Sequence, residues 1–127
     1  MLQMFAKAFG VVFVTLGILG FVPALTPDGK LLGIFEVGTV HNIIHLASGL
    51  VALATGFSSE YASRKYFQVF GVVYGLVTVL GIFYGNNDIL GIVEHNVADI
   101  FLHAAITAAT LYLGFGYRDR GVHTTAV

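Results

Sequence analysis

The residues of this sequence best suited to chemistry are histidines and an aspartate that occur in two pairs. His41 and His45 form one pair, and Asp99 and His103 form the other. The members of each pair are four positions apart, so they project from the same face of an α-helix. Two such faces in contact can bind zinc, iron or copper through imidazole and carboxylate groups. His45 and His103 can also serve as the two axial ligands of a b-type haem.

The two pairs occupy equivalent places in an internal repeat. Three segments recur: Phe9-Gly-Val-Val-Phe13 as Phe70-Gly-Val-Val-Tyr74, Leu19-Gly20 as Leu80-Gly81, and Leu32-Gly-Ile-Phe-Glu36 as Leu90-Gly-Ile-Val-Glu94. The offset between the two copies of the last segment also aligns His45 with His103 and His41 with Asp99. Glu36 and Glu94 precede the two pairs, and we expect them to add metal ligands or to orient the imidazoles.

Four long apolar segments must position these residues. The chain has 127 residues, of which 57% are hydrophobic and only 10% are charged. The segments lie at about 5–25, 39–57, 66–85 and 97–117, and each is near the length that crosses a bilayer as a helix. We therefore expect an all-α membrane protein, in which residues 1–127 form a single bundle of four transmembrane helices.

The repeat predicts how these helices are arranged. Each copy, at about 5–57 and 66–116, crosses the membrane twice, so the copies are related by a pseudo-twofold axis along the membrane normal. Small and hydroxyl-bearing residues follow the histidines on the same helical faces: Ser48, Gly49, Ala52 and Gly56 after His45, and Thr107, Thr110 and Gly114 after His103. Such residues face helix partners rather than lipid. We expect the second and fourth helices to meet through Gly49 and Thr107.

Basic residues predict the orientation. Five of the six gather at the N-terminus, the middle loop and the C-terminus: Lys7, Arg64, Lys65, Arg118 and Arg120. Only Lys30 lies in the other two loops. The positive-inside rule therefore places both termini in the cytoplasm.

Several classes of function are disfavoured. Cysteine is absent, which excludes disulfides and thiol chemistry, and a formal net charge of −1 offers no electrostatic basis for binding nucleic acid. The sequence contains no nucleotide-binding glycine motif, nucleophile elbow or metalloprotease helix, so it does not favour an enzyme. His95 aligns with Val37 and so breaks the repeat; it is expected to be a solvated loop histidine, with an outer metal ligand as the alternative. His123 is expected to have no specific role.

The polar motifs resemble those of a family of small bacterial membrane proteins with four helices, known as a domain of unknown function. The resemblance covers nearly the whole chain and rests on three segments: Phe35-Glu36 leading into His41-Asn42-Ile-Ile-His45-Leu-Ala-Ser-Gly49, Phe70-Gly71-Val-Val-Tyr74-Gly75, and Asn96-Val-Ala-Asp99-Ile-Phe-Leu102-His103. It implies a four-helix fold in the bacterial inner membrane, and it implies no activity.

Three interpretations of the polar cluster remain open. The first is a structural network of hydrogen bonds between helices, in which His41 or His103 pairs with the Asp99 carboxylate. The second is a metal site, and the third is a haem or another porphyrin held by His45 and His103. The last two predict a role in redox chemistry, metal handling or sensing. The first predicts a non-catalytic accessory subunit of a larger membrane complex or a homo-oligomer, and a transporter is a further option.

Overall fold

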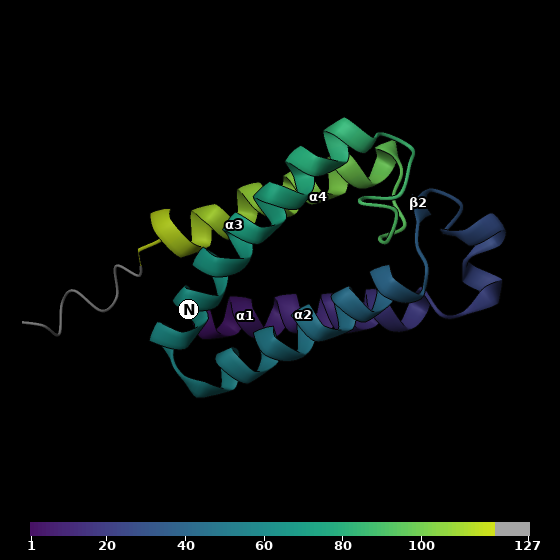
Figure 1. Ribbon diagram of the computed structural model, residues 1–127. Helices are drawn as coiled ribbons and strands as arrows, with labels where there is room; N and C mark the ends of the chain where they lie inside the picture. The colour runs from purple at the N-terminus through teal and green to yellow at the C-terminus, as the bar shows by residue number, and fades with distance from the viewer. Residues whose placement is uncertain (119–127) are drawn as a thin grey trace, which may run out of the picture.

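The computed structural model describes residues 1–118, and within them it has four long helices (Figure 1). They are α1 (Leu2–Leu19), α2 (Thr39–Ser58), α3 (Glu60–Tyr84) and α4 (Val97–Leu111), which continues as a π-helical turn, η3 (Tyr112–Gly116). All four, with η3 included in the last, are long and apolar enough to cross a membrane. The prediction of an all-α bundle with four transmembrane helices is therefore confirmed for this part of the chain.

The bundle consists of two antiparallel hairpins, as the repeat predicts. α1 packs mainly on α2, and α3 packs mainly on α4. The N-terminus and the end of α4 lie at the same end of the bundle, here called the terminus end (Figure 1). The α1–α2 and α3–α4 connections lie at the opposite end, here called the loop end. Each hairpin thus begins and ends on the same side.

Short elements in the loop-end connections were not predicted. The first connection contains two 3₁₀ turns, η1 (Pro23–Leu25) and η2 (Pro27–Gly29), and a small antiparallel hairpin of β1 (Lys30–Leu31) and β2 (Phe35–Glu36). The second connection has an equivalent single bridge between Ile89 and Val93. Each turn contains a leucine with positive φ, Leu32 at 55° and Leu90 at 56°. The repeat therefore extends to the backbone of the loops.

Two predicted helix boundaries were wrong. The first helix ends at Leu19 rather than near residue 25, because Pro23 and Pro27 start separate 3₁₀ turns. The third helix begins at Glu60 rather than near residue 66, because Ser59 is an effective N-cap. Its hydroxyl oxygen accepts a hydrogen bond from the backbone amide of Ala62 at 3.0 Å. The basic pair predicted for a loop is therefore in the first turns of α3.

The small residues face helix partners, but the predicted partner was wrong. A Cβ atom added at Gly49 would lie 2.7 Å from the backbone nitrogen of Val14, so Gly49 packs against α1. Thr107 instead contacts α3, since its hydroxyl oxygen lies 3.3 Å from that of Thr78. The small residues on α2 and α4 therefore pack within their own hairpins, and Gly49 and Thr107 do not join α2 to α4.

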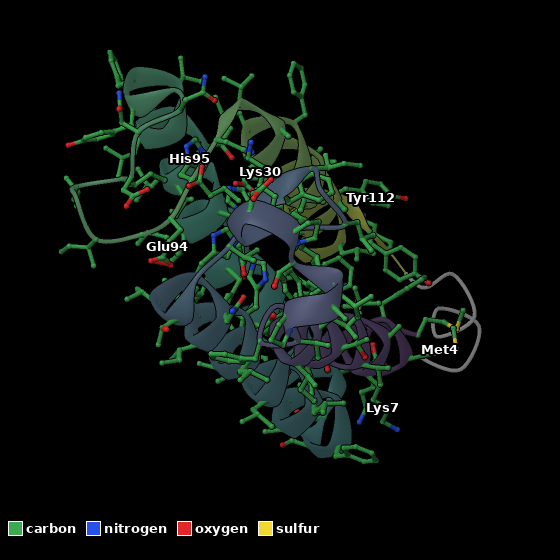
Figure 2. All side chains as sticks on the ribbon, turned by 90° about the vertical axis from the view of Figure 1, so that its right-hand side faces the viewer. Met4, Lys7, Lys30, Glu94, His95 and Tyr112 are labelled. Atoms are coloured by element: carbon green, nitrogen blue, oxygen red, sulfur yellow. The ribbon has the colours of Figure 1, made fainter. Side chains whose placement is uncertain are left out.

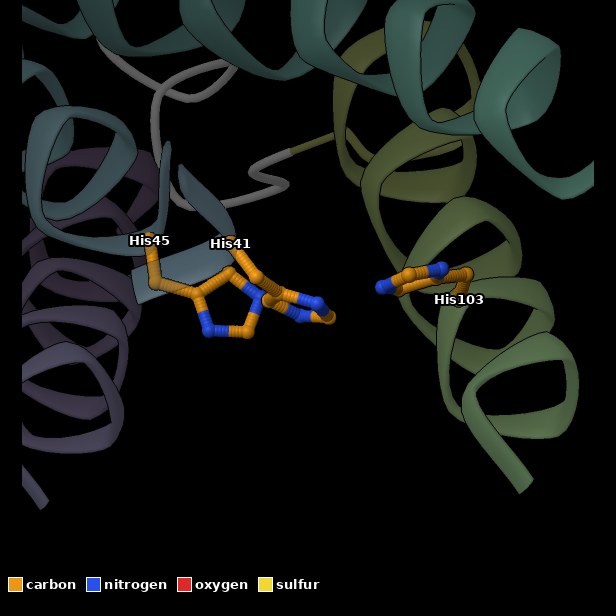
Figure 3. Close-up of side chains that lie close together, drawn as sticks. All are labelled: His41, His45 and His103. Atoms are coloured by element: carbon orange, nitrogen blue, oxygen red, sulfur yellow. The ribbon is translucent and has the colours of Figure 1, made fainter. Parts of the chain in front are cut away.

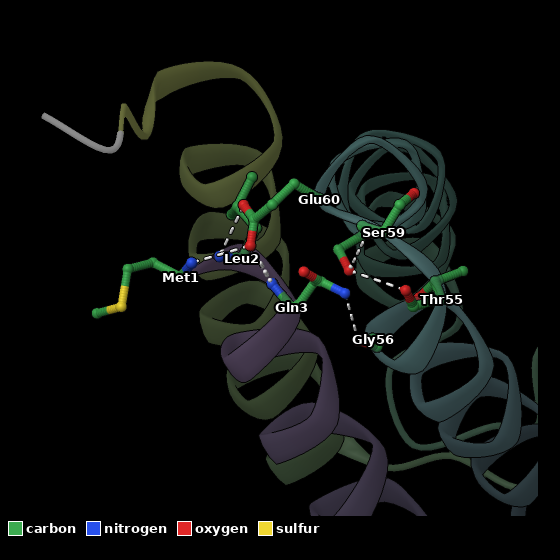
Figure 4. A network of polar contacts seen from close by, with 8 residues as sticks. Met1, Leu2, Gln3, Thr55, Gly56, Ser59 and Glu60 are labelled. Atoms are coloured by element: carbon green, nitrogen blue, oxygen red, sulfur yellow. Dashed lines mark hydrogen bonds and ion pairs between the residues drawn. The ribbon is translucent and has the colours of Figure 1, made fainter. Parts of the chain in front are cut away.

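Apolar and polar packing occupy different ends of the bundle. The buried apolar cluster lies toward the terminus end and consists of Leu2, Ala6, Ala52, Tyr66, Phe67 and Leu113. There the Glu60 carboxylate accepts hydrogen bonds from the amides of Leu2 and Gln3 and pairs with the Met1 amino group, which ties α1 to α3 (Figure 4). The buried histidines, with Asn42, Asn96 and Asp99, lie toward the loop end. The apolar cluster and the polar cluster therefore lie toward opposite ends of the bundle.

Candidate metal centre

Three histidines from the two repeats converge inside the bundle. His41 and His45 come from α2 and His103 comes from α4, and their side chains point toward one another (Figure 3). One ring nitrogen from each lies within 4.8 Å of the other two. Their side chains are only 3%, 4% and 3% exposed, respectively. A single ion placed among these nitrogen atoms would have three imidazole ligands.

His41 is held in place by the second repeat. Its Nδ1 atom lies 2.7 Å from the backbone carbonyl oxygen of Glu94, and its backbone amide donates to Glu94 Oε1 at 3.0 Å. A carbonyl oxygen only accepts hydrogen bonds, so Nδ1 has the proton and the Nε2 lone pair is free. A hydrogen bond of this kind sets the ring orientation and tautomer of many metal-binding histidines.

His45 and His103 have ring nitrogens without hydrogen bonds. The Nδ1 atoms of both are buried, and no described residue donates to them or accepts from them. Their surroundings are aromatic: the ring centroid of Phe13 lies 5.5 Å from that of His45, and the centroid of Tyr74 lies 6.1 Å from that of His103. Buried polar atoms normally have a partner. Asn42 Oδ1, His95 Nε2 and Asp99 Oδ1 are also buried without a hydrogen-bond partner among the described residues. Hydrogen bonds therefore leave the polar cluster incompletely satisfied, at the two imidazoles and around them.

Asp99 has a structural role in the described fold. It forms a capping box with Asn96: Asp99 Oδ2 accepts from the Asn96 amide at 3.0 Å, and Asn96 Oδ1 accepts from the Asp99 amide at 3.1 Å. The expected pairing of Asp99 with His41 or His103 is not among its contacts. Asn96 Nδ2 also donates to the Ile34 carbonyl at 2.9 Å, which links α4 to the loop of the first repeat.

The three carboxylates predicted as ligands lie outside the group of three imidazoles. Asp99 caps α4, and the Glu94 side chain binds the backbone of α2. Glu36 lies in β2, which packs near the start of α4. Figure 2 looks onto the loop end, where Glu94 and His95 are labelled. Within residues 1–118, the structure thus brings together the imidazoles of His41, His45 and His103 without a carboxylate.

The prediction that His95 is a solvated loop histidine was wrong, because its side chain is completely buried. Its Nδ1 atom lies 2.9 Å from the Gly85 carbonyl oxygen, and its ring stacks on His103 with centroids 6.1 Å apart. Gly81 makes the space, since a Cβ atom there would lie 2.7 Å from His95 Nε2. The internal repeat contained a signal for this burial, because Gly81 aligns with Gly20. A Cβ atom at Gly20 would likewise collide with the side chain of Asn42. His123 lies outside the described residues.

A cavity of about 180 Å³ begins at the three histidines and extends between α2 and α3. Its walls are mainly aliphatic and aromatic side chains, including Ile44, Val73 and Val77. Three neutral imidazoles leave one position of a tetrahedral ion open, which is the arrangement of a catalytic or exchangeable metal site rather than a closed structural one. The cavity provides space for a small molecule beside the three imidazoles.

Comparisons with known proteins place the chain in a family. No curated protein and no solved structure matches it. The family model described as a domain of unknown function, DUF4383, matches residues 3–116 and so includes all four helices and all three clustered histidines. The resemblance inferred from the polar motifs agrees with this match. The chain therefore belongs to the DUF4383 family of domains of unknown function.

Proposed function

We propose that this protein binds one transition-metal ion in the membrane, through His41, His45 and His103. The observation behind the proposal is the convergence of three buried ring nitrogens within 4.8 Å. Imidazole is a good ligand for zinc, copper and iron, and three such ligands leave a position for exchange or substrate. This arrangement suits metal handling, sensing or redox chemistry.

The unpaired nitrogens favour an ion over a structural network. A network of interhelical hydrogen bonds would satisfy the imidazoles with neighbouring groups. His41 fits that description, because its Nδ1 atom binds the Glu94 carbonyl. The buried Nδ1 atoms of His45 and His103 have no described partner. Intramembrane ionisable residues without a structural partner are candidates for function.

The positions of the rings favour a single ion over haem. A haem iron has two axial positions, so it would use His45 and His103 on opposite faces of the macrocycle. The His41 ring contacts both of the others, with centroids 4.5 Å from His45 and 5.8 Å from His103. It therefore occupies space that a macrocycle between the two would need. Haem remains the alternative cofactor that the same experiment tests.

A second candidate function is that of a non-catalytic accessory subunit. It is supported by the hydrogen bonds that join the two repeats at the loop end, from His41 to Glu94 and from Asn96 to Ile34. In that case the polar cluster would only fix the relative position of the hairpins. Partners would be a larger membrane complex or further copies of this chain, in addition to the lipid bilayer.

We also propose the bacterial inner membrane as the location, with both termini in the cytoplasm. Lys7, near the start of α1, and Arg64 and Lys65, in the first turns of α3, lie toward the terminus end. Arg118 follows η3 at the same end, and Arg120 lies outside the described residues. Lys30 is at the loop end. The positive-inside rule favours a cytoplasmic terminus end and hence a metal centre near the opposite face.

The proposal is tested by analysing protein purified from its native membrane. Elemental analysis should find about one transition-metal ion per chain, and the absorbance spectrum should lack a Soret band. His45→Ala and His103→Ala should each abolish metal binding, whereas His123→Ala should leave it intact. Protein free of both metal and pigment would refute the proposal and favour the accessory subunit. A Soret band lost in His45→Ala would favour haem instead.

A further inference from the structure

The cavity beside the three histidines opens toward lipid. Ile44 on α2 is 40% exposed and Val73 on α3 is 45% exposed, and both line the cavity. These positions lie within spans that are apolar enough to cross the membrane. At the loop end, Ile89 and Val93 also line the cavity; Ile89 is only 4% exposed and Val93 is partly buried. The more accessible route is therefore lateral, between α2 and α3, rather than along the bundle from the loops.

The interior of the cavity is polar only near the histidines. Its other polar groups are the Ser48 and Tyr74 hydroxyls, and these bind each other, with Tyr74 donating to Ser48 Oγ at 3.2 Å. The remaining wall is aliphatic or aromatic. A molecule that fills this space gains contacts mainly through apolar surface, and its one polar group would be best placed beside the imidazoles.

The size of the cavity limits what can fill it. Its volume is about 180 Å³. An apolar cavity of about 150 Å³ in another protein is known to bind benzene. One substituted six-membered ring therefore fits, and any longer hydrocarbon tail would have to extend through the lateral opening into the bilayer.

We propose that the metal centre takes its ligand from the lipid phase, and that this ligand is a membrane-soluble ring compound with an oxygen donor, of the phenol class. The ring occupies the cavity between α2 and α3, and its oxygen binds the open position of the ion held by His41, His45 and His103. This inference rests on the proposed metal centre, and it adds the chemical class of the ligand and its route of entry.

The test uses the full chain in lipid nanodiscs, loaded with Co²⁺. The visible absorption bands of Co²⁺ report a change in the ligand at the fourth position. Titration with p-cresol should shift these bands in a saturable way. Toluene, which has nearly the same shape and no oxygen, should leave them unchanged.

Filling the cavity should block the phenol and spare the metal. Val77→Phe narrows the cavity from α3, and Ile44→Trp narrows it from α2. Each should weaken p-cresol binding by roughly tenfold or more, as steric changes in an apolar pocket do. Val72→Phe is the matched control, because Val72 is on the same helix and 52% exposed, and it does not line the cavity. It should bind p-cresol as the unmodified protein does.

The possible failures can be told apart. If Co²⁺ does not bind at all, the metal centre itself is refuted, and this inference falls with it. If Co²⁺ binds in a manner that requires His45 but saturating p-cresol leaves the bands unchanged, only the ligand class is refuted. If p-cresol shifts the bands equally in Val77→Phe, Ile44→Trp and Val72→Phe, the ligand does not occupy this cavity, and the inference is also refuted.

Discussion

The Nδ1 atom of His41 lies 2.7 Å from the backbone carbonyl oxygen of Glu94, a residue 53 positions later in the chain. The same glutamate accepts a hydrogen bond from the His41 amide through Oε1 at 3.0 Å. The N-cap position of α2, Gly38, has no side chain to cap the helix, so Glu94 from the other repeat does so. The second repeat thus orients a candidate ligand that belongs to the first.

Removing the Glu94 side chain should loosen this arrangement. In Glu94→Ala the cap on α2 is lost, and the loop that presents the carbonyl to His41 is less well held. Outer contacts of metal ligands typically contribute about ten- to hundredfold in affinity. Glu94→Ala keeps the backbone carbonyl that contacts the His41 ring, so we expect a loss at the lower end of that range, about tenfold. Glu94→Gln keeps an acceptor oxygen and should bind metal nearly as tightly as the unmodified protein. Competition with a chromophoric chelator measures the metal affinity of both variants. Equal affinities of Glu94→Ala and Glu94→Gln would contradict this role of the Glu94 side chain.

Close packing of α1 on α2 should depend on Gly49. A Cβ atom there would lie 2.7 Å from the backbone nitrogen of Val14 and 2.9 Å from the Gly10 carbonyl oxygen, neither of which can move without shifting a helix. Gly49→Ala should destabilise the fold by about 1–3 kcal/mol, the usual effect of overpacking.

Gly75→Ala is the matched control for this prediction. The nearest atom to a Cβ at Gly75 is Thr107 Cγ2 at 3.5 Å, an ordinary contact, and alanine is the better helix former. It should be neutral or slightly stabilising. Thermal unfolding in detergent, followed by circular dichroism, compares the two variants, and an equal loss of stability would contradict the packing described here.

The leucines in the two loop-end turns should be replaceable with a gain in stability. Leu90 has φ of 56° and is 62% exposed, so it accepts an unfavourable backbone conformation without burying its side chain. Asparagine tolerates the left-handed backbone conformation better than leucine does. This conformation costs most other residues roughly 1–2 kcal/mol. Leu90→Asn should therefore raise the unfolding temperature. Ile92→Asn, at an exposed position of the same turn without positive φ, should not.

The orientation is open to a direct test with reporter fusions. A reporter that is active only in the periplasm should be active when inserted at Asp28, in the loop-end connection, and silent when fused after Val127. The physical reason is the excess of basic residues at the terminus end. The reverse pattern would place the metal centre near the cytoplasmic face and would contradict the proposed orientation.

The helical framework could be predicted from sequence because the bilayer imposes it. Four apolar stretches of spanning length, repeated in order, leave few alternatives. The convergence of His41, His45 and His103 was partly predictable, since periodicity places two of them on one face and the repeat aligns the third. Their contact across the hairpins depended on packing that the pattern of small residues suggested incorrectly, because Gly49 and Thr107 serve their own hairpins.

The local roles of two polar residues left only weak signals in the sequence. Asp99 aligns with His41 in the repeat, yet its Oδ2 atom forms a capping box with Asn96, while its Oδ1 atom has no hydrogen-bond partner among the described residues. His95 has a loop-like sequence context, but it is buried because its ring packs against Gly81 of α3. Burial of this kind is set by tertiary packing and leaves little trace in hydropathy.

X-ray absorption spectroscopy at the zinc edge, on protein with one bound Zn²⁺, tests the central claim most directly. The account predicts a shell of light atoms with the multiple scattering of three imidazoles, at Zn–N distances of about 2.0–2.1 Å. His45→Ala should remove one imidazole from that shell or abolish zinc binding. A six-coordinate shell of oxygen without imidazole scattering, or a protein that binds no zinc, would contradict it.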